Sequence, residues 1–144
     1  MSQSHPTHNP SRVFLDSSAN LALLDSTDAN HQAARSIQQK LIQFRPQIFT
    51  TNFITDESYT LILANLGRDA AIAYLDRLYA SSFTVARVSP TDERRAEELL
   101  RQYNDKQFSY TDATSFVVMD RLHLTYAFTF DRDFEQYGKI VLTP

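Results

Sequence analysis

Three aspartates stand at or just after the ends of predicted strands. Asp16 directly follows the apolar run 12–15, Asp131 directly follows the apolar run 127–130, and Asp133 comes two residues later. Each of them alone could be a cap or turn residue. If the two strands are parallel, however, their carboxyl ends lie at the same edge of the sheet, where such folds bind ligands. We therefore expect Asp16 and Asp131 to emerge close together.

Two further acids lie on predicted helices. Glu57 shares a helical face with Ile54 and Leu61, and an unpaired carboxylate on an apolar face costs several kcal/mol. The alternative is a salt bridge from Glu57 to an arginine such as Arg12. Asp112 opens a predicted helix, where the macrodipole stabilises an acid by about 0.3–1 kcal/mol. Its face of the helix nevertheless points inward.

The four acids Asp16, Glu57, Asp112 and Asp131 together predict a metal centre, with Asp133 as a possible extra ligand. Like charges held close together repel, and a cation between them removes that repulsion. The chain has no cysteine and no paired histidine spacing, and hard oxygen ligands favour Mg²⁺ or Mn²⁺. Such a site suits phosphate chemistry, because the ion polarises a phosphoryl oxygen and stabilises the leaving oxygen.

Supporting residues are expected around these acids. The hydroxyls of Ser17 and Thr111 could orient a carboxylate or a water molecule, or could simply cap a helix. Phe108 and Tyr110 flank Asp112 and could contact a base, although most aromatic residues of this chain should be core. Three arginines on one predicted helix could contact phosphate, although a charged helix is usually only a solvated face: Arg94, Arg95 and Arg101.

Composition excludes several other functions. The net charge of −3 argues against a protein that coats nucleic acid through a basic surface. With only Gly67 and Gly138 the chain cannot build a glycine-rich phosphate loop, and it lacks the G-x-S-x-G elbow of a serine hydrolase. Residues 1–11 are polar, with two prolines and no apolar segment, so we expect a disordered tail and no secretory signal. With no apolar run long enough for a membrane span, we expect a cytoplasmic protein.

The remaining residues, 12–144, are expected to form one α/β domain. The segments predicted as strands are 13–15, 47–50, 83–88, 126–130 and 139–142. The segments predicted as helices are 18–25, 31–44, 52–66, 68–80, 90–103 and 111–123. Strands separated by helices require crossover connections, which predict a mainly parallel sheet of four to five strands with helices on both faces.

The chain resembles PIN-domain ribonucleases, and more closely the VapC-like toxins of type II toxin–antitoxin systems. Four motifs carry the resemblance: Asp-Ser-Ser-Ala at 16–19, Glu57 after Thr50-Thr51, Ser-Tyr-Thr-Asp-Ala at 109–113, and Thr-Phe-Asp-Arg-Asp-Phe at 129–134. It covers residues 12–142 and implies a PIN-like three-layer sandwich. Asp16, Glu57 and Asp112 match the three central acids of the family, and Asp131 matches the fourth. The role of Asp133 is not settled by the resemblance.

The resemblance also implies an activity and partners. It predicts an Mg²⁺- or Mn²⁺-dependent endoribonuclease, a toxin with a cognate antitoxin protein, and a homodimer. Two alternatives remain within the family: a housekeeping nuclease of RNA processing, and a PIN-like binding module that has lost catalysis. A phosphotransfer domain of receiver or haloacid dehalogenase type is disfavoured. The latter expects a second acid two residues after the first, where this chain has Ser18.

Overall fold

The computed structural model describes residues 9–144, so most of the predicted tail at 1–11 lies outside the described residues. Five strands form the sheet: β1 (Arg12–Leu15), β2 (Gln47–Thr51), β3 (Thr84–Ala86), β4 (Tyr126–Phe128) and β5 (Ile140–Val141). Seven helices accompany them: α1 (Ser17–Leu24), α2 (His31–Phe44), α3 (Asn52–Leu66), α4 (Arg68–Ala80), α5 (Pro90–Gln102), α6 (Tyr110–Arg121) and α7 (Asp133–Tyr137). Among the described residues, none of these helices has the length and apolar character needed to cross a bilayer.

The sheet is entirely parallel, in the order β3-β2-β1-β4-β5. β1 lies at its centre, with Phe14 opposite Phe49 of β2 on one side and Ala127 of β4 on the other. The predicted parallel α/β sheet is therefore confirmed. Because β1 and β4 are parallel neighbours, their carboxyl ends share one edge, as expected for the segments that carry Asp16 and Asp131.

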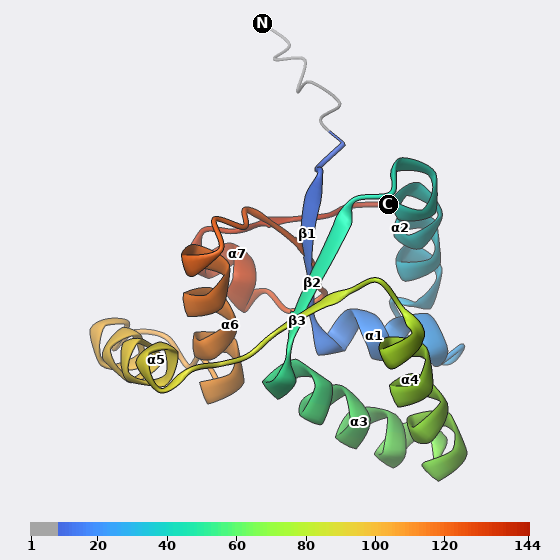
Figure 1. Cartoon of the computed structure of the whole chain (residues 1–144), viewed down its shortest axis with the longest axis horizontal. Helices are drawn as coiled ribbons and strands as arrows, with labels where there is room; N and C mark the ends of the chain where they lie inside the picture. Colours follow the sequence, from blue (N-terminus) through green and yellow to red (C-terminus); the bar gives the residue numbers. More distant parts are fainter. Residues whose placement is uncertain (1–8) are drawn as a thin grey trace, which may run out of the picture.

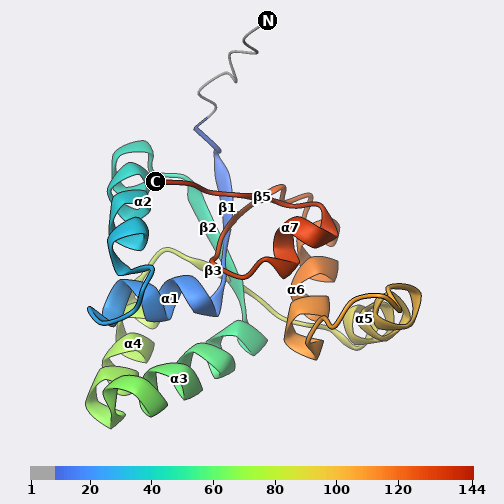
Figure 2. The same ribbon diagram turned by 180° about the vertical axis from the view of Figure 1, so that it is seen from behind.

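Helices cover both faces of the sheet (Figures 1 and 2). Phe14 and Ala127 pack against α5, α6 and α7 in a core that contains Phe116 and Phe134. Alternate residues of the same strands, such as Val13, pack against α1 and α2 on the opposite face. Side chains alternate across a strand, so the three consecutive apolar residues 13–15 of β1 contribute to two cores at once. The three-layer arrangement predicted from the resemblance is confirmed.

Three strands, β3, β4 and β5, end earlier than predicted. In β3 and β4, side chains take the hydrogen bonds that would extend the ladder. β4 stops at Phe128, since the next free N–H groups, those of Phe130 and Asp131, donate to the hydroxyls of Ser18 and Thr129 at 2.9 and 3.0 Å. β3 covers Thr84–Ala86 and not 83–88, since the Val88 N–H donates to Asn52 Oδ1 at the start of α3. Such side-chain bonds compete directly with secondary structure. The short helix α7 was not predicted.

Local capping signals fix the helix starts. Ser89 and Asp92 form a capping box at α5, with Pro90 at the first helical position as predicted. Ser109 and Asp112 form a second capping box at α6. Gly67 ends α3 with a φ of 91°, a left-handed conformation that glycine adopts without strain. All six predicted helices thus begin within one residue of their predicted start, and α2, α3 and α4 have the predicted bounds.

One ion pair joins α5 to α6, the helix that carries Asp112. Asp92 is only 1% exposed and accepts hydrogen bonds from Arg121 Nε at 3.0 Å and Nη2 at 2.9 Å. Burial alone would raise the pKa of Asp92, but Arg121 and the Ser89 N–H outweigh it and hold that pKa below its ordinary value. The start of α5 is therefore tied to the end of α6.

We expect Arg121→Met to lower the free energy of unfolding by about 1–3 kcal/mol, because it leaves the buried Asp92 without its charged partner. Since the pKa of Asp92 is depressed, its stabilising effect is lost as the pH falls below 3.8. The deficit of the variant should therefore shrink in acid. Urea melts at pH 7 and pH 3 measure it, with the exposed Arg101→Met as control. Equal deficits at both pH values would mean that the ion pair is not the cause.

Candidate active site

Asp16 stands at the carboxyl end of β1, 2% exposed, in the N-cap position of α1. Its side chain makes no cap bond. Instead its Oδ2 accepts hydrogen bonds from the hydroxyls of Ser18 and Thr129, each at 2.7 Å. Burial raises the pKa of Asp16; those two hydrogen bonds oppose the rise, and the carboxylate of Asp131 adds to it. The alternative of a capping side chain is thus wrong for Asp16, which is a buried carboxylate held by two hydroxyls.

Glu57 is linked to Asp16 through a single residue. The Ser17 hydroxyl donates to Glu57 Oε1 and also lies 3.5 Å from Asp16 Oδ1. Burial raises the pKa of Glu57, and the carboxylates of Asp16 and Asp131 raise it further. The alternative salt bridge to Arg12 is wrong, because that guanidinium donates to the Leu122 carbonyl at 2.7 Å. The acid on the apolar face of α3 therefore points toward other acids.

Asp112 serves as a helix cap and also lies among other carboxylates. It is 6% exposed, and its Oδ2 accepts the Ser109 N–H at 3.4 Å in the capping box. Burial, followed by a hydrogen bond with Asp133 and the charges of Asp131 and Asp16, raises the pKa of Asp112 to about 8. Both interpretations of this residue, cap and site acid, are compatible with the structure.

Three carboxylates form the tightest acidic group. Asp112, Asp131 and Asp133 each offer an oxygen, and these oxygens lie within 4.8 Å of one another. Asp131 does not end β4 as expected, but follows it by three residues in a turn where its Oδ1 accepts the Asp133 N–H at 2.9 Å. Asp133, considered from the sequence as a possible extra ligand, belongs to the same group.

Sequence reasoning missed two residues of this region, Ser18 and Thr129. Their hydroxyls lie 3.1 Å apart and both donate to Asp16. They also accept the N–H groups of Phe130 and Asp131, so they join the end of β1 to the turn that holds Asp131. A hydroxyl residue just after each of the two strands could have indicated this link between their ends. At Ser18 the pattern predicts only the start of a helix.

The other predicted site residues fare differently. Ser17 orients a carboxylate as expected. Thr111 is half-buried, and its described contact is a backbone carbonyl that accepts from Thr114. Phe108 is 8% exposed and packs edge-on against Phe116 in the core, which leaves little surface for a base. Tyr110 remains 39% exposed beside the acids.

The three predicted arginines lie on the exposed surface of α5. Arg94 donates to Thr91 at 3.2 Å on the same helix. Arg95 lines a hollow between α5 and α6 that also includes Asp120 and Tyr137 and none of the clustered acids. No described contact brings Arg94, Arg95 or Arg101 to the acids, so the structure leaves their predicted phosphate contacts without support.

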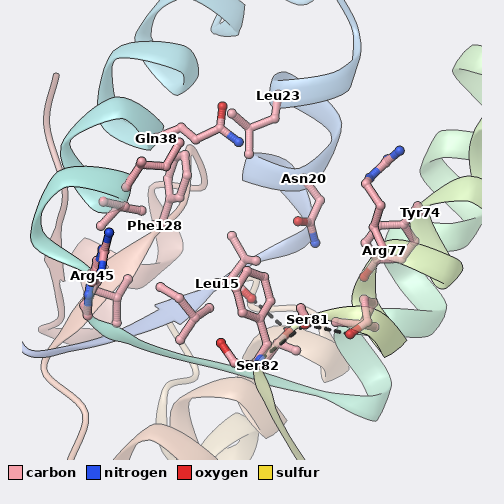
Figure 3. Close-up of a pocket in the computed structure, with 18 of the residues that line it drawn as sticks. Leu15, Asn20, Leu23, Gln38, Arg45, Tyr74, Arg77, Ser81, Ser82 and Phe128 are labelled. Carbon is pink, nitrogen blue, oxygen red and sulfur yellow. Dashed lines mark hydrogen bonds between the residues drawn. The ribbon is translucent and has the colours of Figure 1, made fainter.

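A larger hollow lies on the opposite face of the sheet (Figure 3). Its volume is about 580 Å³, and its lining is mainly apolar, from β1, β2, α2 and α4. Phe128 and Arg45 lie on one side of it, and Tyr74 and Arg77 on the other. No aspartate or glutamate among the described residues lines it, so it is separate from the acidic cluster.

The acidic cluster fits a divalent cation. Its donors are carboxylate oxygens, the ligands that Mg²⁺ and Mn²⁺ prefer. Asp112, Asp131 and Asp133 are close enough to share one ion, and Asp16 raises the pKa of Asp112 through its charge. A raised carboxylate pKa means that the group takes up a proton when no cation compensates its neighbours. The cluster is therefore consistent with the binding of a divalent cation.

Comparisons with known proteins agree with this geometry. Residues 13–140 match the PIN domain family. The 23S rRNA-specific endonuclease VapC20 of Mycobacterium tuberculosis is 30% identical over 132 residues, which cover 92% of this chain and 98% of VapC20. The crystal structure of VapC20, described as a toxin that cleaves the sarcin–ricin loop, superposes with a TM-score of 0.83 over 92% of this chain and 99% of that one.

Two more distant structures share the fold. VapBC2 of Rickettsia felis, bound to a DNA fragment from its promoter, has a TM-score of 0.67 at 12% identity, over 91% of this chain and 97% of that one. FitAcB of Neisseria gonorrhoeae has a TM-score of 0.64 at 13% identity, over 90% of this chain and 96% of that one. Together with the PIN match and the VapC20 relationship, these findings identify the chain as a member of the PIN-domain family, a homologue of the VapC endoribonuclease toxins.

Proposed function

We propose that this protein is a metal-dependent endoribonuclease in which Asp16, Glu57, Asp112 and Asp131 hold Mg²⁺ or Mn²⁺. Asp133 is a further ligand or supports one. The observation that carries the proposal is the acidic group itself, in which three carboxylate oxygens lie within 4.8 Å of one another. A fold tolerates such mutual repulsion where a cation belongs.

The bound ion and the residues around it would have different roles. When bound, the ion would polarise the scissile phosphate, lower the pKa of a water molecule and stabilise the leaving oxygen. Ser18 and Thr129 hold Asp16 in one position, and Ser17 sets the orientation of Glu57. Fixed ligands of this kind reduce the reorganisation needed when phosphate and ion come together.

We further propose a substrate and partners. The relationship to VapC20 supports RNA as the substrate, and a structured loop of 23S rRNA as the first target to test. A toxin of this kind would act with a cognate antitoxin protein. The mainly apolar hollow of about 580 Å³ between α2 and α4 offers surface for a protein partner. A homodimer follows from the VapC resemblance alone.

The nuclease assay uses total RNA with Mg²⁺ or with EDTA, followed by mapping of new RNA ends. We expect cleavage by the wild-type protein in Mg²⁺ only, and none by Asp112→Asn, which keeps the shape of the cap but removes a charge. The matched control is Asp76→Asn, an exposed acid on α4. Cleavage by Asp112→Asn at the wild-type rate would exclude this residue from the site.

Asp112→Asn should also raise the melting temperature of the metal-free protein, by about 3 °C for each kcal/mol of relieved repulsion. The folded-state pKa of about 8 lies above the ordinary 3.8, so the wild type loses stability as the pH rises between these values. The advantage of the variant should therefore be absent near pH 4 and largest near pH 8. Thermal melts in EDTA across this range test it, and a variant that melts lower at pH 8 would make Asp112 structural.

Mg²⁺ or Mn²⁺ should raise the melting temperature of the wild-type protein, because an ion that binds only the folded state stabilises it by mass action. The rise in melting temperature should be much smaller for Asp16→Ala. For the control Asp76→Asn it should equal that of the wild type. Thermal shift measurements over a metal titration provide the comparison. Equal shifts in wild type and Asp16→Ala would remove the ion from this position.

Asp131 should matter more for cleavage than Asp133. The charge of Asp131 raises the pKa of Asp16, Glu57 and Asp112, whereas Asp133 contributes only to that of Asp112. We therefore expect Asp131→Asn to reduce the cleavage rate roughly 10- to 100-fold, the range for losing a supporting group at a metal site. Asp133→Asn should have a smaller effect. The reverse order, in single-turnover assays, would make Asp133 the fourth acid.

A further inference from the structure

The two helices that carry Glu57 and Asp112 start side by side, and each has an aromatic residue at its start. Phe53 is the second residue of α3 and Tyr110 is the first of α6. Their ring centroids are 6.2 Å apart, and the ring planes are inclined by 30°. Figures 1 and 2 both place these helix starts next to each other at the carboxyl edge of the sheet.

This aromatic pair borders the acids. Phe53 lies four residues before Glu57, one helical turn away on the same face of α3. Tyr110 lies two residues before the buried Asp112. The pair therefore lies at the starts of α3 and α6, whose first two turns also carry Glu57 and Asp112 of the proposed metal centre.

The Tyr110 ring is exposed but held in place. It is 39% exposed, so a large part of its surface is open to a ligand. One side of it contacts Phe53, and its hydroxyl donates to Glu93 Oε1 of α5 at 3.4 Å. Burial and the carboxylates of Glu93 and Glu97 raise the pKa of Tyr110, so the phenol stays neutral and can donate. The ring is therefore pre-oriented before any ligand arrives.

We propose that Phe53 and Tyr110 form a stacking platform for one unpaired RNA base next to the scissile phosphate. This inference rests on the proposed ribonuclease function and adds a subsite to it. Proteins read unpaired RNA by stacking splayed-out bases on aromatic rings. Glu93 favours a base over a phosphate at this place, because its carboxylate repels phosphate but accepts N–H donors from a base edge. The stacked base belongs to the nucleotide directly before or directly after the scissile phosphate.

A purely structural role for the pair makes a different prediction. If Phe53 and Tyr110 only brace α3 against α6, removing a ring disturbs the acids and weakens every RNA alike. If they stack on a base, the loss depends on that base being present. The two roles are therefore separated by an RNA that lacks a single base.

The experiment first maps the cut made by the wild-type protein. A hairpin carrying that site is then synthesised intact and with an abasic nucleotide at either side of the cut. Binding is measured by fluorescence anisotropy in the Asp16→Asn background, which is expected not to cleave, with and without Tyr110→Leu or Phe53→Leu. Tyr79→Leu is the matched control, because Tyr79 is a 76% exposed tyrosine on α4. Tyr110→Phe, which keeps the ring, should lose less than Tyr110→Leu.

We expect Tyr110→Leu to weaken binding of the intact hairpin roughly 5- to 100-fold, the range for one base–aromatic stack. Against one of the two abasic hairpins the same substitution should change the Kd less than twofold. Equal losses on intact and abasic RNA, or no loss on the intact hairpin, would overturn the platform while leaving the nuclease function in place. A wild-type protein that cuts no RNA would overturn both.

Discussion

Repulsion between carboxylates is the constraint on which this structure depends. Asp112, Asp131 and Asp133 lie within 4.8 Å of one another, and Asp16 is near enough to raise the pKa of Asp112. Bringing such groups together costs free energy unless a cation or protons compensate the charge. The surrounding structure holds these acids in place. β1 lies at the centre of the sheet, the capped helices α3 and α6 carry Glu57 and Asp112, and serine and threonine hydroxyls bond to Asp16 and Glu57. The free energy gained by packing in the rest of the domain offsets the cost of this repulsion.

The sheet and the hydroxyl groups solve different parts of the problem. A parallel sheet brings the ends of β1 and β4 to one edge without using any side chain. Fixing the carboxylates once they are there requires short polar side chains. The hydroxyls of Ser18 and Thr129 each make hydrogen bonds of two kinds. They donate to Asp16, and they accept backbone N–H groups from the turn after β4. The same atoms that end β4 therefore also orient the first acid.

The sequence predicted those parts of the fold that depend on local chemistry. Helical periodicity, Pro90 and Gly67 gave correct helix bounds, and apolar strands between helices gave the parallel sheet. The end of β4 could not be predicted, because it depends on a hydrogen bond between residues 112 positions apart, from the Phe130 N–H to Ser18. The helix α7 was missed because its five residues are too few for a periodic signal. Asp16 and Asp131 stood out because they directly follow apolar runs, and Glu57 and Asp112 because charge is rare on inward-facing helix positions. Ser18 and Thr129 did not, because a hydroxyl near a strand end usually only caps a helix.

The position of β1 has a consequence for how the protein is made. Of the five described strands, β1 comes first in the sequence and lies at the centre of the sheet, and it stays unpaired on its β4 side until residues 126–128 have been synthesised. Asp131 and Asp133 follow later still. A nascent chain can fold its amino-terminal units early, but the acidic group cannot form before these residues exist. The acidic site therefore becomes complete only after β4 has been made and can pair with β1.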